Sequence, residues 1–186
     1  MLRDEELIQG CKVGDKRMQR KLYEQYSGVL MAVACRYSRT EEDARDILQE
    51  SFVKIFKKID SFRNESSLKH WMRRIVVNTA INYQRSKLYL YPMMDVNDMY
   101  DLKEEAVALS DYSFQELLSL LQKLPDGCRV IFNLYAIEGY KHKEIAEMTG
   151  VTEGTSKSQF SRARKLLKEM IEESQLERNY YAMERG

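Results

Sequence analysis

The stretch FRNESSLKHWMRRIVVNTAINYQR, residues 62–85, decides how this chain folds. From residue 68 onward its apolar side chains recur with the 3.6-residue period of an α-helix, which gives one face that can pack on a core. The residues of this apolar face are Leu68, Met72, Ile75, Val76 and Thr79. The sequence therefore predicts an amphipathic helix that follows a short polar connector.

A second stripe lies beside the apolar face of the same helix, because its members recur at helical spacing. Its residues are Trp71, Arg74, Asn78, Asn82 and Arg85. Amides suit base edges, guanidinium groups suit phosphates and an aromatic ring can stack on a base. The stripe is typical of a nucleic-acid surface, and from this stretch alone a polar helix face with a tryptophan at its edge is an equally good interpretation.

Charge is segregated along the 186 residues, although the formal net charge is only +1. Residues 40–51 carry five acidic side chains against Arg45 alone, whereas residues 63–87 carry six basic side chains against Glu65 alone. A net charge near zero gives no global attraction to nucleic acid or membrane. Any anion-binding surface must therefore be local.

The residues that usually carry catalysis or bind metals are scattered in this sequence. Cys11, Cys35 and Cys128 form no CxxC pair, which favours reduced thiols in a cytosolic protein. His70 and His142 are isolated, and no nucleophile motif or phosphate-binding loop is present. The first ten residues and the rest of the chain contain no apolar run of membrane-spanning length. We expect a soluble cytoplasmic protein with no catalytic residues, no metal, no cofactor and no membrane insertion.

The N-terminal half predicts three further helices, over residues 4–12, 16–37 and 41–59. Gly14 and Asp15 separate the first two, and Thr40 is suited to cap the third. The second helix is expected to turn five side chains inward: Met18, Leu22, Tyr26, Val29 and Val33. The third is expected to build the core with Ala44, Ile47, Leu48, Phe52, Ile55 and Ile59.

The third helix has an apolar edge that its core stripe does not use. Gln49 and Phe56 lie at this edge with Phe52 between edge and core, and Val53 lies on the far face. An apolar edge beside acidic and amide groups is typical of a partner surface. Periodicity alone slightly favours the simpler interpretation, a wide core stripe.

The composition changes over residues 86–111, which are acidic and hold no helical stripe of useful length. They predict an extended linker between two domains. Helices are expected to resume at about residue 112. Pro125-Asp126 is expected to end that helix and start the next, which carries its apolar residues over 129–137 and is broken by Glu138-Gly139. Further helices are expected over 141–148 and 153–173, with a frayed C-terminal end. No strand pattern is present.

Residues 141–170 have the pattern of a helix-turn-helix, with Ala146 on the first helix, Gly150 in the turn and Val151 after it. The second helix is expected to face the core with Ser156, Phe160, Ala163, Leu167 and Met170. Its opposite face holds Ser158, Ser161, Arg162 and Lys165, flanked by Thr155, Lys157 and Lys168. Short hydroxyl side chains let a helix enter the major groove, where arginine reaches base edges and lysine reaches phosphates. This pattern favours duplex DNA binding over an ordinary basic helix.

Taken together, these segments resemble the extracytoplasmic-function (ECF) group of bacterial RNA polymerase sigma factors over nearly the whole chain. DARDILQESFVKIFKKIDSF, residues 43–62, is similar to sigma regions 2.1–2.2, and SSLKHWMRRIVVNTAINYQR, residues 66–85, to regions 2.3–2.4. LQKLPDGCRVIFNLYAIEGYKHKEIAEMTGVTEGTSKSQFSRARKLL, residues 121–167, is similar to region 4. The resemblance implies an all-α fold with region 2 over 1–87, a linker over 88–111, region 4 over 112–176 and a frayed tail over 177–186.

The resemblance also implies partners and roles. Docking on the β′ clamp coiled coil of core RNA polymerase would fall to Asp43, Asp46, Gln49, Glu50, Phe52 and Phe56. Reading and melting of the promoter −10 element would fall to Arg63, Lys69, Trp71, Arg74, Asn78, Asn82 and Arg85, where a loop captures a flipped base. Reading of the −35 duplex would fall to Thr155, Lys157, Ser158, Ser161, Arg162 and Lys165. The polymerase β flap and an anti-sigma factor are further expected partners, and Asn64 stands where many relatives carry glycine.

Two other functions remain open at this point. A stand-alone helix-turn-helix regulator would bind an operator tightly without polymerase, usually as a dimer. An interaction protein that sequesters other factors would leave the basic stripes unexplained.

Overall fold

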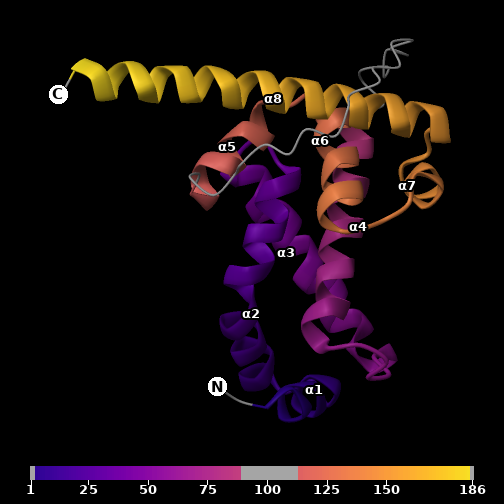
Figure 1. Cartoon of the computed structure of the whole chain (residues 1–186). Helices are drawn as coiled ribbons and strands as arrows, with labels where there is room; N and C mark the ends of the chain where they lie inside the picture. Colours follow the sequence, from indigo (N-terminus) through magenta and orange to yellow (C-terminus); the bar gives the residue numbers. More distant parts are fainter. Residues whose placement is uncertain (1–2, 89–112, 185–186) are drawn as a thin grey trace. The chain divides into compact units, whose positions relative to one another are not determined.

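The computed structural model describes residues 3–88 and 113–184, and all of their regular elements are helical (Figure 1). This confirms the all-α prediction. Nearly all of the predicted acidic linker, residues 89–111, lies outside the described residues. The chain forms two compact units, Met1–Ser86 and Lys87–Gly186.

The first unit holds four α-helices whose bounds follow the sequence signals closely. They are α1 Asp4–Lys12, α2 Lys16–Tyr37, α3 Glu41–Lys58 and α4 Leu68–Leu88, with a 3₁₀ turn at Ile59–Ser61. Gly14 takes a left-handed conformation (φ 76°) after α1, and Asp15 caps α2 by accepting from the backbone N–H of Arg17 at 2.8 Å. Thr40 caps α3 through the N–H of Asp43 at 3.1 Å. The predicted bounds of α1 and α2 are therefore confirmed.

The core of the first unit lies between α2, α3 and α4. Every residue of the predicted α3 stripe is buried. On α2, Leu22, Tyr26 and Val33 are buried as predicted, but Val29 is 38% exposed and that prediction is wrong. Leu30 takes the inward position instead, because a helix places residues three and four apart on nearly the same face and the sequence does not decide between them.

Polar contacts fasten α4 to the rest of the first unit. The hydroxyl of Tyr83 donates to Asp43 at the start of α3 at 2.7 Å. The amide of Gln84 donates to the carbonyl of Tyr37 at the end of α2, also at 2.7 Å. Farther along, Lys54 of α3 donates to Thr79 at 3.2 Å. These contacts, together with the apolar face, hold α4 in a fixed orientation on α2 and α3.

The second unit is built around one long helix. Its elements are α5 Phe114–Lys123, α6 Asp126–Phe132, a π-helical turn Asn133–Ile137, α7 His142–Thr149 and α8 Glu153–Glu184. Ser113 and Glu116 form a capping box that starts α5. α8 passes its predicted end near residue 173 and covers most of the predicted frayed tail. No glycine or proline occurs between residue 155 and Gly186 to stop it.

The core of the second unit forms where α5, α6 and α8 meet, with Leu121, Leu124, Cys128 and Ala163 buried together. Arg129 is also fully buried at the corner between α5 and α6. Its guanidinium donates to the carbonyl of Leu124 at 2.9 Å and to the carboxylate of Asp126. Arg129 therefore satisfies carbonyls at the end of α5 that the turn leaves without helical partners.

Candidate nucleic-acid and polymerase interfaces

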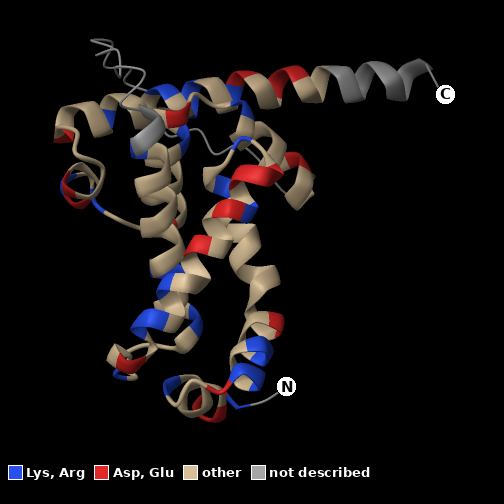
Figure 2. Ribbon diagram, turned by 180° about the vertical axis from the view of Figure 1, so that it is seen from behind, with Lys and Arg blue, Asp and Glu red and all other residues tan. Residues whose placement is uncertain are grey.

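The exposed face of α4 carries the stripe that the sequence predicts. Arg74, Asn78, Asn82 and Arg85 are exposed, and Trp71 is half-buried at the start of the stripe. The basic positions of α4 are among the blue segments of Figure 2. A row of amides and guanidinium groups open to solvent can contact bases and phosphates together. Two further predicted residues, Arg63 and Lys69, are exposed in and next to the loop before α4.

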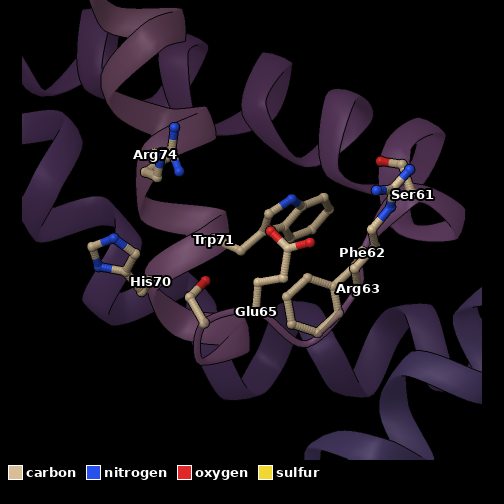
Figure 3. Close-up of a pocket in the computed structure, with 8 residues that line it drawn as sticks. Ser61, Phe62, Arg63, Glu65, His70, Trp71 and Arg74 are labelled. Carbon is tan, nitrogen blue, oxygen red and sulfur yellow. The ribbon is translucent and has the colours of Figure 1, made fainter.

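A pocket of about 500 Å³ opens where the loop before α4 meets the first turns of that helix (Figure 3). Its lining includes Phe62, Arg63, Glu65, His70, Trp71 and Arg74. The rings of Phe62 and Trp71 lie 5.2 Å apart at 49°. Phe62 is buried and supports the indole from the core, whereas the half-buried Trp71 keeps part of its ring available for stacking. The pocket thus combines an aromatic wall with cationic groups, beside one carboxylate.

The loop that forms this pocket contains an unusual backbone conformation. Asn64 has φ 58° and is the one non-glycine residue with a positive φ in the described ranges 3–88 and 113–184. Asparagine is among the few residues that adopt this left-handed region readily, and glycine is the usual occupant. Asn64 therefore supplies the turn that a glycine would supply. The helix that follows is started by Ser67, whose hydroxyl accepts from the N–H of His70 at 3.2 Å.

The predicted polymerase-docking residues divide into surface and core. Gln49, Asp46 and Glu50 are exposed, and the aromatic Phe56 is half-buried at their edge. Phe52 is only 4% exposed and belongs to the core. Glu50 forms an ion pair with Lys54 at 2.7 Å, and the half-buried Asp43 accepts from Tyr83 as described above.

The sequence did not indicate one residue at the predicted polymerase-docking edge of α3. Tyr23 of α2 is 45% exposed, and its ring lies 4.6 Å from that of Phe52. Phe52 in turn lies 5.8 Å from Phe56, so the three rings form one aromatic row across α2 and α3. Tyr23 is next to the inward Leu22, and only the packing of α2 on α3 brings it to the predicted edge.

The helix-turn-helix forms as predicted. Gly150 has φ 78°, and its N–H donates to the carbonyl of Ala146 at 2.9 Å to end α7. On α8, Ser156 and Ala163 are buried as predicted. The predicted DNA-facing side chains of α8 remain at least partly exposed: Thr155, Lys157, Ser158, Ser161, Arg162 and Lys165.

An aromatic cluster that the sequence does not reveal lies behind the start of α8. The His142 ring stacks on Tyr135 of the π-helical turn at 4.3 Å and 15°, and Phe160 meets both rings. Burial lowers the pKa of His142, and nearby Lys157 acts in the same direction, whereas Glu153 opposes it. His142 is therefore held in its neutral form more strongly than a free histidine.

Other kinds of site are absent from the described part of the chain. Within it, no helix is long and apolar enough to cross a membrane, and no group of His, Cys, Asp or Glu side chains could hold a metal ion. Cys11, Cys35 and Cys128 are free thiols. Burial raises the pKa of Cys128 to about 11, which keeps it an unreactive thiol at neutral pH.

Comparison with known families matches both halves of the chain. The model for Sigma-70 region 2 matches residues 22–88, and the model for Sigma-70 region 4 matches residues 114–167. Both occur in one chain in this order, which does not favour the alternative of a stand-alone regulator.

Full-length relatives agree with this match. The ECF RNA polymerase sigma-E factor of Haemophilus influenzae is 30% identical over 183 residues, covering 92% of this chain and 96% of the relative. The corresponding factor of Escherichia coli K12 is 29% identical, covering 92% and 95%. A solved structure of the sigma factor RpoE in complex with the anti-sigma factor NepR from Bartonella quintana has a TM-score of 0.51 at 25% identity, covering 82% of this chain and 96% of that one. The chain therefore belongs to the ECF family of RNA polymerase sigma factors.

Proposed function

We propose that the exposed face of α4 and the pocket beside it read and open the −10 element of the promoters to which this sigma factor directs RNA polymerase. The observation that carries the proposal is the continuous surface from the pocket to Arg85, with an aromatic wall at one end and amides along its length. The pocket itself, with a volume of about 500 Å³, lies in the range of about 300–1,000 Å³ found for pockets that enclose small molecules. A single base extruded from the duplex fits this size class.

The chemistry assigns a role to each part of this surface. Trp71 stacks on an extruded base, Asn78 and Asn82 bond to base edges, and Arg74 and Arg85 hold phosphates. Extrusion of a base costs on the order of a few kcal/mol, and stacking on an aromatic side chain returns about 1–3 kcal/mol. Stacking and hydrogen bonding together therefore offset much of the cost of opening.

We further propose that the exposed edge of α3 docks on the β′ clamp coiled coil of core polymerase. Gln49 supplies an amide, and Phe56, together with Tyr23, supplies aromatic surface. Phe52 supports these rings from the core and contributes through them, because its own side chain is almost fully covered.

In the second unit, we propose that α8 enters the major groove of the −35 duplex while the unit contacts the β flap. Arg162 is the residue suited to a base edge, and Lys157 and Lys165 are suited to phosphates. We propose that the chain acts in the cytoplasm by binding alone, with no covalent chemistry. Because a solved relative is held by an anti-sigma factor, a partner of that class is also proposed to regulate this chain.

Run-off transcription with purified core polymerase tests the proposed function. Specific initiation that depends on the added chain is expected, and transcripts no different from those of core alone would refute the proposal. In separate binding assays, Gln49→Ala is expected to weaken binding to core polymerase while duplex DNA binding by the full chain stays unchanged. Gln9→Ala, the same change on an exposed position of α1, is the matched control.

A further inference from the structure

The recognition helix α8 buries two polar side chains on the face that packs against the core. Ser156 is fully buried and Gln159 is 6% exposed. They are three residues apart, so they share one face of the helix. A core-facing stripe is ordinarily apolar, as α8 itself shows farther along at Ala163 and Ile171. The first turns of α8 depart from that rule.

Ser156 and Gln159 each form a hydrogen bond with a side chain of a different helix. The hydroxyl of Ser156 lies 2.9 Å from Nδ1 of His142, the first residue of α7. The side-chain oxygen of Gln159 accepts from the thiol of Cys128 on α6, also at 2.9 Å. α7 and α6 therefore each hold the start of α8 at one defined point.

Packing also fixes the direction of the His142 ring. It lies nearly parallel to Tyr135 at 4.3 Å and meets the ring of Phe160 edge-on at 5.8 Å and 62°. Tyr135 comes from the π-helical turn, where a widened backbone changes the direction of its side chain. The nitrogen that contacts Ser156 is therefore held in place by Tyr135 from the π-helical turn and by Phe160 from α8 itself.

Buried polar pairs of this kind distinguish between helix orientations because hydrogen bonds are directional. In the observed orientation both polar side chains have partners, so their burial is compensated. A rotation of α8 by one residue, about 100°, would leave both buried groups without partners, which is costly. An apolar face would tolerate such a rotation better, because hydrophobic contact is not directional.

We propose that the contacts of Ser156 with His142 and of Gln159 with Cys128 fix the rotation of α8 about its axis and so determine which side chains of α8 face DNA. This inference rests on the proposed −35 reading by α8. Thr155 and Lys157 flank Ser156 in sequence, so any rotation at this point passes directly to residues of the reading face. The four contact residues are positioning residues, since they act through their neighbours on α8.

The test compares −35 selectivity for variants that remove the contacts but keep the volume. Holoenzyme is formed from the full chain and core polymerase, and the preferred −35 sequence is selected from a randomised pool. The ratio of affinities for preferred and scrambled −35 promoters is then measured for Ser156→Ala, His142→Phe and Gln159→Met. Ser119→Ala, on the exposed side of α5, is the matched control.

We expect each variant to lower the affinity ratio about tenfold, the size of one lost base contact, while affinity for scrambled promoters is retained. Ser156→Ala combined with His142→Phe should lose no more than either change alone, because both remove the same contact. Unchanged ratios in Ser156→Ala and Gln159→Met overturn the inference, and so does loss of helical circular dichroism, which would make the contacts a requirement of folding. A wild-type holoenzyme without any −35 preference refutes the proposed function itself.

Discussion

The backbone of Asn64 makes a quantitative prediction about the loop that forms the pocket. At φ 58° an ordinary L-residue pays about 1–2 kcal/mol, and asparagine pays less. Asn64→Ala should therefore lower the free energy of unfolding of the first unit by about 1 kcal/mol. Asn64→Gly removes the strain but adds about 0.5–1 kcal/mol of unfolded-chain entropy, so it should change stability little. Asn64→Val, with its branched side chain, should cost the most.

The only tryptophan of the chain makes this prediction measurable. Trp71 packs on Phe62 in the same loop region, so its fluorescence reports unfolding of the first unit alone. For a urea m-value of about 1–3 kcal/mol per molar, a loss of 1 kcal/mol moves the midpoint by about 0.3–1 M. Ser66→Ala, an exposed change in the same loop, should leave the midpoint unchanged.

Promoter opening should follow the same order. Holoenzyme with Asn64→Gly should open promoters as wild type does, whereas Asn64→Val should open them poorly because its loop cannot keep the pocket in shape. The reasoning is refuted if Asn64→Ala has a wild-type midpoint while Asn64→Gly loses about 1 kcal/mol. That result would mean that the loop does not hold residue 64 in the left-handed region.

Three other predictions address the second unit and the pocket charge. Arg129→Ala should lower the free energy of unfolding of the second unit by about 3–5 kcal/mol, because buried carbonyls and the carboxylate of Asp126 lose their partner. Melting followed by circular dichroism should show this loss, while the unfolding transition reported by Trp71 fluorescence stays unchanged. The pKa of His142 is lower in the folded protein than its ordinary value of 6.5, so protonation favours the unfolded state. The stability that neutral His142 contributes is complete above pH 6.5 and is lost as pH falls through the folded pKa. The second unit should therefore melt at a lower temperature at about pH 5.5 than at about pH 7.5. His142→Phe should flatten this dependence; an equally steep dependence in that variant would assign it to other groups. Glu65→Gln removes the acidic group from the pocket and should raise the affinity for single-stranded DNA about two- to fivefold at low salt. A gain in affinity that persists at about 1 M salt would contradict an electrostatic origin.

Local signals were sufficient to predict where most helices lie, although not the end of α8 or the π-helical turn. Asp15 and Thr40 mark helix starts, Gly150 marks a helix end, and the apolar period of α3 identifies its buried face. Each of these signals depends on residues within one or two turns of one another. The same is true of the exposed stripe on α4, which needs only helical geometry.

Features that depend on contacts between helices could not be predicted in this way. Gln159 is a polar residue in a basic helix, and only the approach of α6 makes it a buried acceptor for Cys128. The cluster of Tyr135, His142 and Phe160 requires the π-helical turn, for which the sequence carries no recognised signal. The pocket likewise requires Phe62 to fold back under Trp71. Helical periodicity gives the direction of a side chain but not its partner.

The bonds from Tyr83 to Asp43 and from Gln84 to Tyr37 also have a mechanical consequence. They join the far end of α4 to α2 and α3, so the three helices turn as one block. About 22 Å of helix separates these bonds from the first turn of α4. If α3 docks on the polymerase clamp as proposed, a rotation of the block by about 5° about an axis through these bonds would swing the first turn of α4 by about 2 Å. On the proposed roles of α3 and the pocket, a small movement of the polymerase clamp becomes a displacement of the pocket against DNA.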